Sequence, residues 1–178
     1  MEPPIRPATP GDADAIAALH SDSWQRTYRG MLSDAYLDGP VVEEHLANWR
    51  NRFADPRPDQ HGWLVAGEDG LLGFVLLFGD EAPGRATWVD NLHVRHDVRG
   101  RGIGLALLRT AAAWTVTERP GLAMFLWVMA ANHPARAFYR RAGGVEVERS
   151  EFPAPGGGTS IQLRCWWADP RQLLEPTG

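Results

Sequence analysis

The sequence predicts an α+β fold in which two helices precede a run of strands, and three observations carry this prediction. Apolar residues recur at helical spacing over residues 16–53. From Trp63 onward, short apolar runs alternate with turn residues, as they do in strands. A strand, a glycine-rich loop, a helix and another strand then follow one another in the middle of the chain. Its 178 residues match the usual length of one domain, so we expect a single domain over residues 1–178.

The N-terminal segment begins with a short extended stretch and continues into two helices. Residues 5–8 are predicted as a short edge strand. Residues 9–12, Thr-Pro-Gly-Asp, combine a capping box with a proline in the first turn, which is typical of a helix start. Two stripes at helical spacing predict the helices that follow: Ile16, Leu19 and Ser23 or Trp24 in the first, and Val42, Leu46, Trp49 and Phe53 in the second.

Three extended runs come next. Residues 63–66 and 71–78 are apolar and flank the turn Gly-Glu-Asp-Gly, so they predict a β-hairpin. Residues 87–94 form a third extended run. We therefore expect three consecutive strands after the two helices.

The second half alternates helices with strands. Ile103, Leu107, Leu108, Ala111 and Trp114 recur at helical spacing, and Pro120-Gly121 ends that helix. Residues 122–128 are apolar enough for a central strand. A short helix starting near Pro134 and two last strands, at about 145–152 and 159–167, complete the predicted order ααβββαβαββ, with the short first strand as an addition.

Composition excludes several kinds of chemistry. All 18 basic residues are arginine, so neither a Schiff-base lysine nor a P-loop lysine is present. The 22 acidic residues give a net charge of −4, which disfavours nucleic acid as a partner. The single cysteine, Cys165, has no second cysteine for a disulfide or a zinc cluster, and we interpret it as a buried apolar residue. We therefore expect no metal.

No membrane segment is predicted. The N-terminus lacks an apolar run of signal-peptide length, and the longest apolar stretch, residues 71–78, is far shorter than the ~20 residues of a membrane span. A soluble, cytoplasmic protein without a membrane partner is expected.

The loop at residues 99–104, Arg-Gly-Arg-Gly-Ile-Gly, has the features of an anion site. Glycines allow the backbone to approach an anion closely, and the N-terminus of the following helix favours negative charge. A Rossmann fingerprint would need a small residue at Leu105, and a Walker loop would need the missing lysine. Both standard nucleotide motifs therefore fail, and Arg-x-x-Gly-x-Gly at Arg99, Gly102 and Gly104 remains.

This pattern resembles the pyrophosphate-binding signature of the GNAT superfamily of acyl-CoA-dependent N-acyltransferases. Residues 90–94, Asp-Asn-Leu-His-Val, are similar to the family's preceding strand. Residues 132–139, Asn-His-Pro-Ala-Arg-Ala-Phe-Tyr, resemble its later Asn-x-x-Ala-x-x-Phe-Tyr element. The resemblance covers about residues 87–147.

The resemblance implies a fold and assigns cofactor binding and acceptor binding to separate parts of the chain. The fold has α/β/α layers around a mixed, mostly antiparallel sheet of about six to seven strands, splayed between the fourth and the fifth. Residues of about 87–147 form the cofactor-binding core, and about 12–53 form the acceptor-side helices. The implied co-substrate is acetyl-CoA, whose pantetheine arm pairs with backbone groups near Leu92 and Val94. The implied cofactor-binding residues are Leu92, His93, Val94, Arg99, Gly100, Arg101, Gly102, Ile103, Gly104, Asn132, Ala135 and Phe138.

The resemblance also implies a reaction, in which a neutral amine attacks the thioester directly. Tyr139 matches the family's thiolate-protonating tyrosine, and a phenol pKa of about 10 suits that task; the alternative is a packing aromatic. Asn132 matches a residue that bonds the cofactor arm, and it also suits a helix cap. Asp90 is the candidate general base, because strand alternation places it on the face of Leu92. His93 faces the other way in a regular strand, although a bulge there, usual in the family, would change that. A solvent-exposed or arginine-paired carboxylate is the alternative for Asp90.

The acceptor side is expected near Trp24 and Tyr28. They lie four residues apart on one helix face, where aromatic rings suit an apolar or cationic amine, although packing on the sheet is the alternative for both. Arg136 and Arg140, one helical turn apart, are candidates for the cofactor phosphates, and an exposed, solvated helix face is the alternative, favoured for at least one of them. No dense acidic cluster of the sort expected for a polyamine or aminoglycoside is present.

The sequence as a whole predicts a function. It indicates an N-acetyltransferase that moves the acetyl group of acetyl-CoA to a primary amine of a small molecule, an amino acid or a peptide, similar to bacterial members of the family. The alternative is a non-catalytic acyl-CoA-binding sensor or interaction module on the same fold. A homodimer is compatible with the resemblance, because dimers are common in the family.

Overall fold

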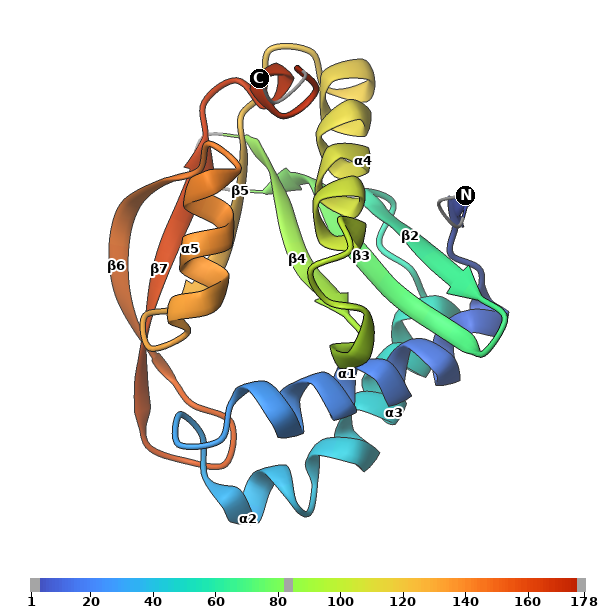
Figure 1. Cartoon of the computed structure of the whole chain (residues 1–178), viewed down its shortest axis with the longest axis vertical. Coiled ribbons are helices and arrows are strands. Elements are labelled where there is room, and N and C mark those ends of the chain that lie inside the picture. Colours follow the sequence, from blue (N-terminus) through green and yellow to red (C-terminus); the bar gives the residue numbers. More distant parts are fainter. Residues whose placement is uncertain (1–3, 82–84, 176–178) are drawn as a thin grey trace.

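The computed structural model describes residues 4–81 and 85–175, and seven strands form one sheet within them (Figure 1). The sheet order is β1-β2-β3-β4-β5-β7-β6. Every neighbouring pair is antiparallel except β4 and β5, which are parallel. The strands are β1 Ile5–Pro7, β2 Gln60–Gly67, β3 Gly70–Glu81, β4 Ala86–Val94, β5 Met124–Met129, β6 Val145–Pro153 and β7 Thr159–Trp167. The predicted α+β class and mixed, mostly antiparallel sheet are confirmed.

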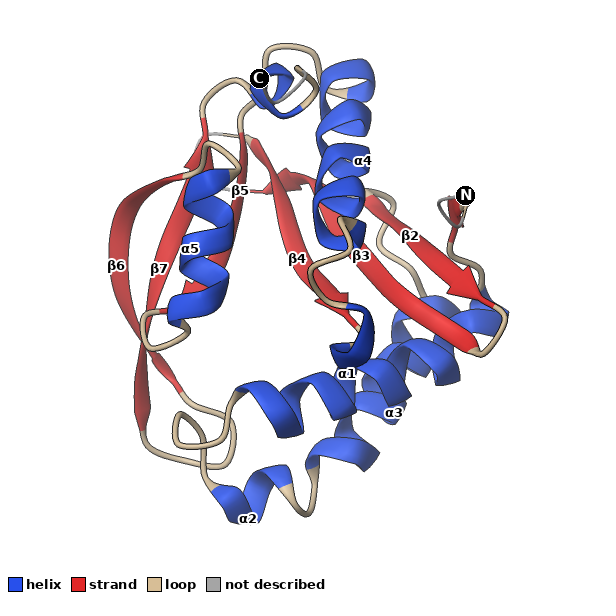
Figure 2. Ribbon diagram, in the orientation of Figure 1, coloured by secondary structure: helices blue, strands red, loops and turns tan. Residues whose placement is uncertain are grey.

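The helices flank the sheet on both faces (Figure 2). They are α1 Ala13–Thr27, α2 Asp34–Leu37, α3 Val41–Ala54, α4 Ile103–Glu118 and α5 His133–Arg141, with 3-10 turns at Pro10–Asp12, His96–Val98 and Pro170–Leu173. The α2 helix was not predicted, because one turn is too short to show a periodic stripe. Its N-cap, Ser33, accepts a hydrogen bond from the Tyr36 N–H at 3.2 Å.

Two apolar clusters hold the layers together. On one face, α1 and α3 pack on β2 and β3 around Ile16, Trp49 and Phe74, all nearly inaccessible to solvent. On the other face, α4 packs around Leu107 and Leu108, and residues of α5 join the same cluster. Each face of the sheet therefore buries its own layer of side chains, as an α/β/α arrangement requires.

The sheet splits between β4 and β5. These strands pair only at Thr87 with Met124 and at Trp88 with Phe125, and beyond those pairs they diverge. Figure 2 shows the resulting V between the two strands. The predicted splay between the fourth and fifth strands is confirmed.

A β-bulge interrupts β4 just before the split widens. Val89 pairs with Leu77 and Asn91 with Leu76, which leaves Asp90 as the extra residue. Asp90 therefore turns towards α3, where it bonds Arg52, whereas Leu92 packs in the α4 cluster. The expectation that Asp90 and Leu92 share a face is wrong, because the alternation of side chains holds only along a regular pleat.

No helix in the described ranges, 4–81 and 85–175, is long and apolar enough to cross a membrane.

Candidate active site

A cavity of about 690 Å³ opens where β4 and β5 diverge, bordered by α1, β4, the glycine-rich loop, β5 and α5. It brings together most of the residues predicted from sequence, although they come from five separate segments. The predicted residues that border it are Tyr28, Asp90, Leu92, His93, Val94, Arg99, Gly100, Gly102, Ile103, Gly104, Asn132, Ala135, Phe138 and Tyr139. Two predicted site residues, Arg101 and Trp24, are not among the described residues that border the cavity. Arg101 lies exposed on the loop.

The glycine-rich loop forms an open cradle at the N-terminus of α4. Gly100 and Gly102 have φ of +79° and +82°, and a Cβ added to either would meet nothing within 4 Å. The hydrogen-bond ladder of α4 starts with the Ala106 N–H bonded to the Gly102 carbonyl at 3.0 Å. The N–H groups of the first turn therefore precede the ladder and face an anion position.

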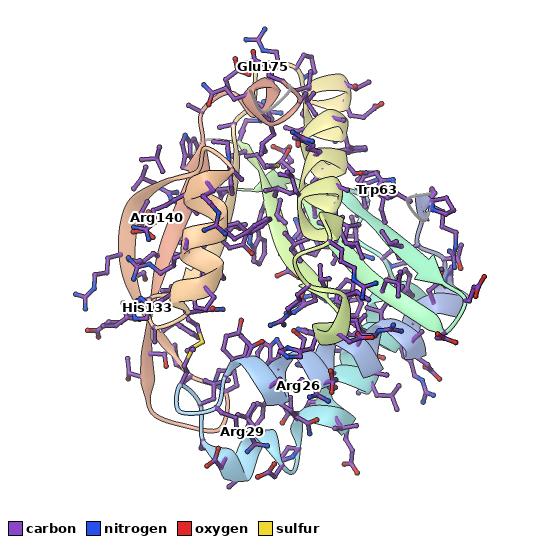
Figure 3. The ribbon with its side chains drawn as sticks, in the orientation of Figure 1. Arg26, Arg29, Trp63, His133, Arg140 and Glu175 are labelled. Carbon is purple, nitrogen blue, oxygen red and sulfur yellow. The ribbon has the colours of Figure 1, made fainter. Side chains whose placement is uncertain are left out.

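The arginine side chains near this cradle differ from expectation. Arg99 reaches back to α1, where it donates to the hydroxyls of Thr27 at 3.2 Å and Ser23 at 3.4 Å. Arg136 is held by Glu146 of β6 at 2.8 Å, so it does not serve the cradle. Arg140 lies on the side of α5 that faces β6 (Figure 3).

Arg141 borders the cavity instead, and sequence reasoning missed it. It also lines an adjacent hollow of about 360 Å³ between α5, α4 and the Pro170–Leu173 turn. Its spacing of three residues from Phe138 was the available signal, since residues three apart on a helix share a face.

Tyr139 occupies the inner wall of the cavity. Its ring packs edge-on against Phe138, at 5.2 Å between centroids, and against Trp167 at 6.1 Å. Burial raises the pKa of its hydroxyl above the ordinary 10, and the nearby Tyr28 and Cys165 groups add to the shift. Burial likewise raises the Cys165 pKa to about 12, so the cysteine remains a thiol. Tyr139 therefore keeps its proton at neutral pH.

Tyr28 and Asn132 meet across the mouth of the split. The Asn132 side chain lies close enough to the Tyr28 hydroxyl to counteract part of the rise in its pKa, and its Oδ1 accepts the Ala135 N–H at 3.3 Å as the cap of α5. Burial raises the Tyr28 pKa. This contact ties α1 to α5 and places two polar groups at the cavity.

Trp24 packs against neighbouring side chains, which was the alternative to binding the acceptor. Its ring contacts Tyr28 edge-on at 5.1 Å and His45 at 4.8 Å, within the apolar cluster that joins α1 to α2. It therefore supports the wall that Tyr28 presents to the cavity.

Asp90 borders the cavity from the bulge of β4. Its Oδ2 accepts hydrogen bonds from Arg52 of α3 and from the neighbouring Asn91 side chain, whereas Oδ1 accepts none from the described residues. The Arg52 guanidinium lies over the Trp49 ring at 5.3 Å and over the Phe78 ring at 5.7 Å, so the ion pair is held in place.

Three histidines form a cluster beside the cavity that sequence reasoning missed. The His20 and His45 rings stack at 3.8 Å between centroids, and His93 lies 4.5 Å from His20. Ser23 shares a hydrogen bond with Nδ1 of His93 at 2.9 Å. The available signal was His20, four residues after Ile16 on the buried stripe of α1.

The histidine cluster is held neutral. The Trp49 indole donates to Nδ1 of His20 at 3.0 Å, so the proton of neutral His20 sits on Nε2, which is buried and lacks a partner among the described residues. Burial lowers the pKa of His93 to about 3 and that of His45 to about 4, and the His20 pKa falls in the same direction. Within the described chain these histidines are not part of any group able to hold a metal.

A split sheet with an anion cradle on one side and a protonated tyrosine on its wall defines an acyl-transferring site. Comparison with known families agrees, since the model described as "Acetyltransferase (GNAT) family" matches residues 16–144. The chain belongs to the GNAT acetyltransferase family and is an N-acetyltransferase. The family uses acetyl-CoA and an amine acceptor.

Curated relatives and solved structures extend this similarity. A probable N-acetyltransferase of Mycobacterium tuberculosis is 29% identical over 140 residues, covering 77% of this chain and 76% of its own. The streptothricin acetyltransferase of Streptomyces lavendulae is 29% identical over 152 residues, covering 78% and 79%. The Thermoplasma acidophilum PaiA N-acetyltransferase in complex with coenzyme A shares the fold, with a TM-score of 0.70, 18% identity and coverage of 92% and 98%. A spermidine N-acetyltransferase SpeG chimera from Vibrio cholerae and hSSAT has a TM-score of 0.69, 18% identity and coverage of 99% and 100%.

Proposed function

We propose that this enzyme transfers the acetyl group of acetyl-CoA to a primary amine of a small molecule, an amino acid or a peptide, by direct attack within a ternary complex. The observation that carries the proposal is the single cavity that joins the glycine cradle, the free edge of β4 and Tyr139. An amine and a thioester held together in one site react without a covalent enzyme intermediate, because positioning alone removes much of the entropic barrier.

The cavity suits acetyl-CoA, which supplies the thioester when bound. The cradle offers open space above Gly100 and Gly102 and unpaired N–H groups for a pyrophosphate. Arg141 adds a positive charge on the α5 side. Beyond Trp88 the edge of β4 has lost its partner strand, so this edge near Leu92 and Val94 can pair with the pantetheine arm. The Val94 carbonyl also accepts a hydrogen bond from Nε of Arg99 at 3.3 Å.

Two side chains carry the proton transfers in this proposal. Tyr139 donates a proton to the departing thiolate, and its raised pKa keeps that proton available at neutral pH. Asp90 accepts the amine proton through Oδ1, while Arg52 and Asn91 fix the carboxylate through Oδ2. Tyr28 and Asn132 border the same cavity, and we assign them to orienting the bound groups.

The acceptor class follows from the same site and from one relative. The Streptomyces lavendulae relative is named for streptothricin, a small molecule, which supports a small-molecule amine here. Among the described residues that border the cavity, Asp90 is the only acidic one.

Initial-velocity measurements with both substrates varied test the proposal. Direct attack predicts intersecting double-reciprocal lines, and Cys165→Ala should keep the pattern because the thiol is buried and protonated. Parallel lines, together with loss of activity in Cys165→Ala, would show a covalent enzyme intermediate instead.

A further inference from the structure

The face of the sheet that carries α1 and α3 continues onto β5 and β7 as a row of flat aromatic rings. Trp88 and Phe125 stack with 8° between their planes, and Phe125 and Trp166 stack with 25° between theirs. Phe125 is buried at 3% exposure, whereas Trp88, Trp127 and Trp166 are half-buried. We call Trp88, Phe125, Trp127 and Trp166 the aromatic face.

Two ion pairs border the aromatic face and neutralise its charges. Arg52 binds Asp90 on the β4 side. On the β6 side Arg164 binds Glu148 at 2.8 Å, and its guanidinium lies over Trp166 at 5.3 Å and over Phe125 at 5.9 Å. The Arg164 guanidinium also lies over the Trp127 ring, at 6.0 Å from its centroid, so this arginine sits among the rings. Both acidic groups are therefore matched by an arginine, and the aromatic face combines flat rings with one cation whose charge Glu148 already balances.

The aromatic face runs directly into the reaction cavity. Trp127 belongs to both, because it also borders the cavity, and Asp90, which borders the cavity too, faces α3 on the same side of the sheet. Met129, two residues after Trp127 on the same side of β5, packs against the α1–α2 cluster. The face therefore starts beside Asp90, the proposed acceptor of the amine proton, and leads away from it across β5 and β7.

We propose that the aromatic face binds the body of the acceptor, and that the acceptor is a primary amine on a short arm attached to a flat aromatic group. This inference rests on the proposed function. Rings stack favourably on half-buried tryptophans, and an apolar group displaces water from them at little polar cost. A polyamine would find both carboxylates already paired with arginines, so its further charges would gain little there.

An acceptor panel tests this with the full-length protein and acetyl-CoA, by following thiol release. The panel contains 2-phenylethylamine and tryptamine, n-butylamine as an aliphatic amine, and spermidine. We expect kcat/KM for the two aromatic amines to exceed that for n-butylamine by at least about tenfold, a typical worth of one stacked ring. Equal or better kcat/KM with n-butylamine or spermidine would overturn the assignment of the aromatic face while leaving acetyl transfer intact. Thiol release with none of the four amines would overturn the inference alone, because the proposed function also covers amino-acid and peptide amines and is tested separately by the two-substrate kinetics.

A matched pair of variants tests whether the preference for aromatic amines arises at the aromatic face. Trp166→Leu should remove most of the aromatic preference, mainly through KM, because it takes one ring from the face. Trp63→Leu replaces another half-buried strand tryptophan, which packs in the α4 cluster on the opposite face, and should keep the preference. An acetyl-CoA-induced rise in melting temperature shows that each variant is folded. A preference kept in a folded Trp166→Leu protein, or lost equally in both variants, would contradict the assignment.

Discussion

The Tyr139 hydroxyl is the group on which the proposed leaving-group chemistry depends. Tyr139→Phe keeps the ring contacts with Phe138 and Trp167 and removes only the proton donor. We expect kcat to fall by ~10²-fold or more, the usual range for a lost general acid, with an unchanged acetyl-CoA-induced rise in melting temperature. Steady-state kinetics and thermal melts measure both. Wild-type turnover in the variant would return Tyr139 to a packing role.

Substitution of Asp90 tests the second proposed proton transfer, from the attacking amine to a carboxylate. Asp90→Asn removes the proton acceptor and leaves a side chain of the same shape at the bulge. We expect the rate to fall by ~10²-fold at neutral pH, with a smaller loss as the pH approaches the pKa of the amine, because the amine then arrives without its extra proton. The pH profile of kcat/KM measures this.

The partner of Asp90 provides the control for that experiment. Arg52→Gln disrupts the same ion pair while keeping the carboxylate, so a purely structural role for the pair predicts similar pH profiles in both variants. Equal losses at every pH in Asp90→Asn would assign the proton to another acceptor.

At the scale of the element, the anion site that we propose in the loop before α4 depends on the shape of the backbone. Gly102→Glu places bulk and negative charge in the cradle and forces a side chain into a left-handed conformation, at a cost of about 1 kcal/mol. We expect the acetyl-CoA-induced rise in melting temperature to disappear. Gly121→Glu is the matched control, because Gly121 has φ of +84° and equally open surroundings but follows the other end of α4. A preserved rise in Gly102→Glu would overturn the cradle.

The same element shows how far sequence reasoning reaches. The strand, loop and helix around Gly102 were predicted because their signals are local: an apolar run, glycines and a helical stripe. A bulge near His93 was suggested by the family resemblance, but its position at Asp90 was not predicted. That position depends on how β4 pairs with β3, and one extra residue moves a side chain to the other face. Arg99 was placed in the cradle by its position in the loop, but hydroxyls of α1, more than seventy residues earlier in the chain, hold its side chain.

At the scale of the whole molecule, the site exists only because separate layers meet at the split. The histidine cluster joins three elements, with His20 on α1, His45 on α3 and His93 on β4. No local pattern predicts this meeting, since each histidine in isolation looks like an ordinary residue of its own segment. The cluster packs α1 and α3 onto the strand that lines the cavity.

This cluster should make the stability of the fold depend on pH. In the unfolded chain each histidine binds a proton near pH 6.5, whereas in the folded protein burial lowers the pKa to about 3 for His93 and to about 4 for His45. The unfolded state therefore holds more protons below pH 6.5, and the free energy of unfolding falls as the pH falls from there. Each such histidine contributes a slope of about 1.4 kcal/mol per pH unit. His20 has a lowered pKa too, and so does the partly buried His61 on β2.

Denaturant unfolding at pH 7.0, 6.0 and 5.0 measures this slope, in a range above the ordinary pKa of the carboxylates. We expect the free energy of unfolding to decrease steadily over that range in the wild type. His45→Gln removes one buried imidazole and should reduce the slope by about 1.4 kcal/mol per pH unit, whatever it does to stability at pH 7. His133→Gln changes an exposed histidine at the start of α5 and should leave the slope unaltered. A flat wild-type profile between pH 6.5 and 5 would mean that the folded protein binds protons as readily as the unfolded chain. The three rings would then have to separate or admit water on protonation, which would loosen the contact between α1, α3 and β4 beside the reaction cavity.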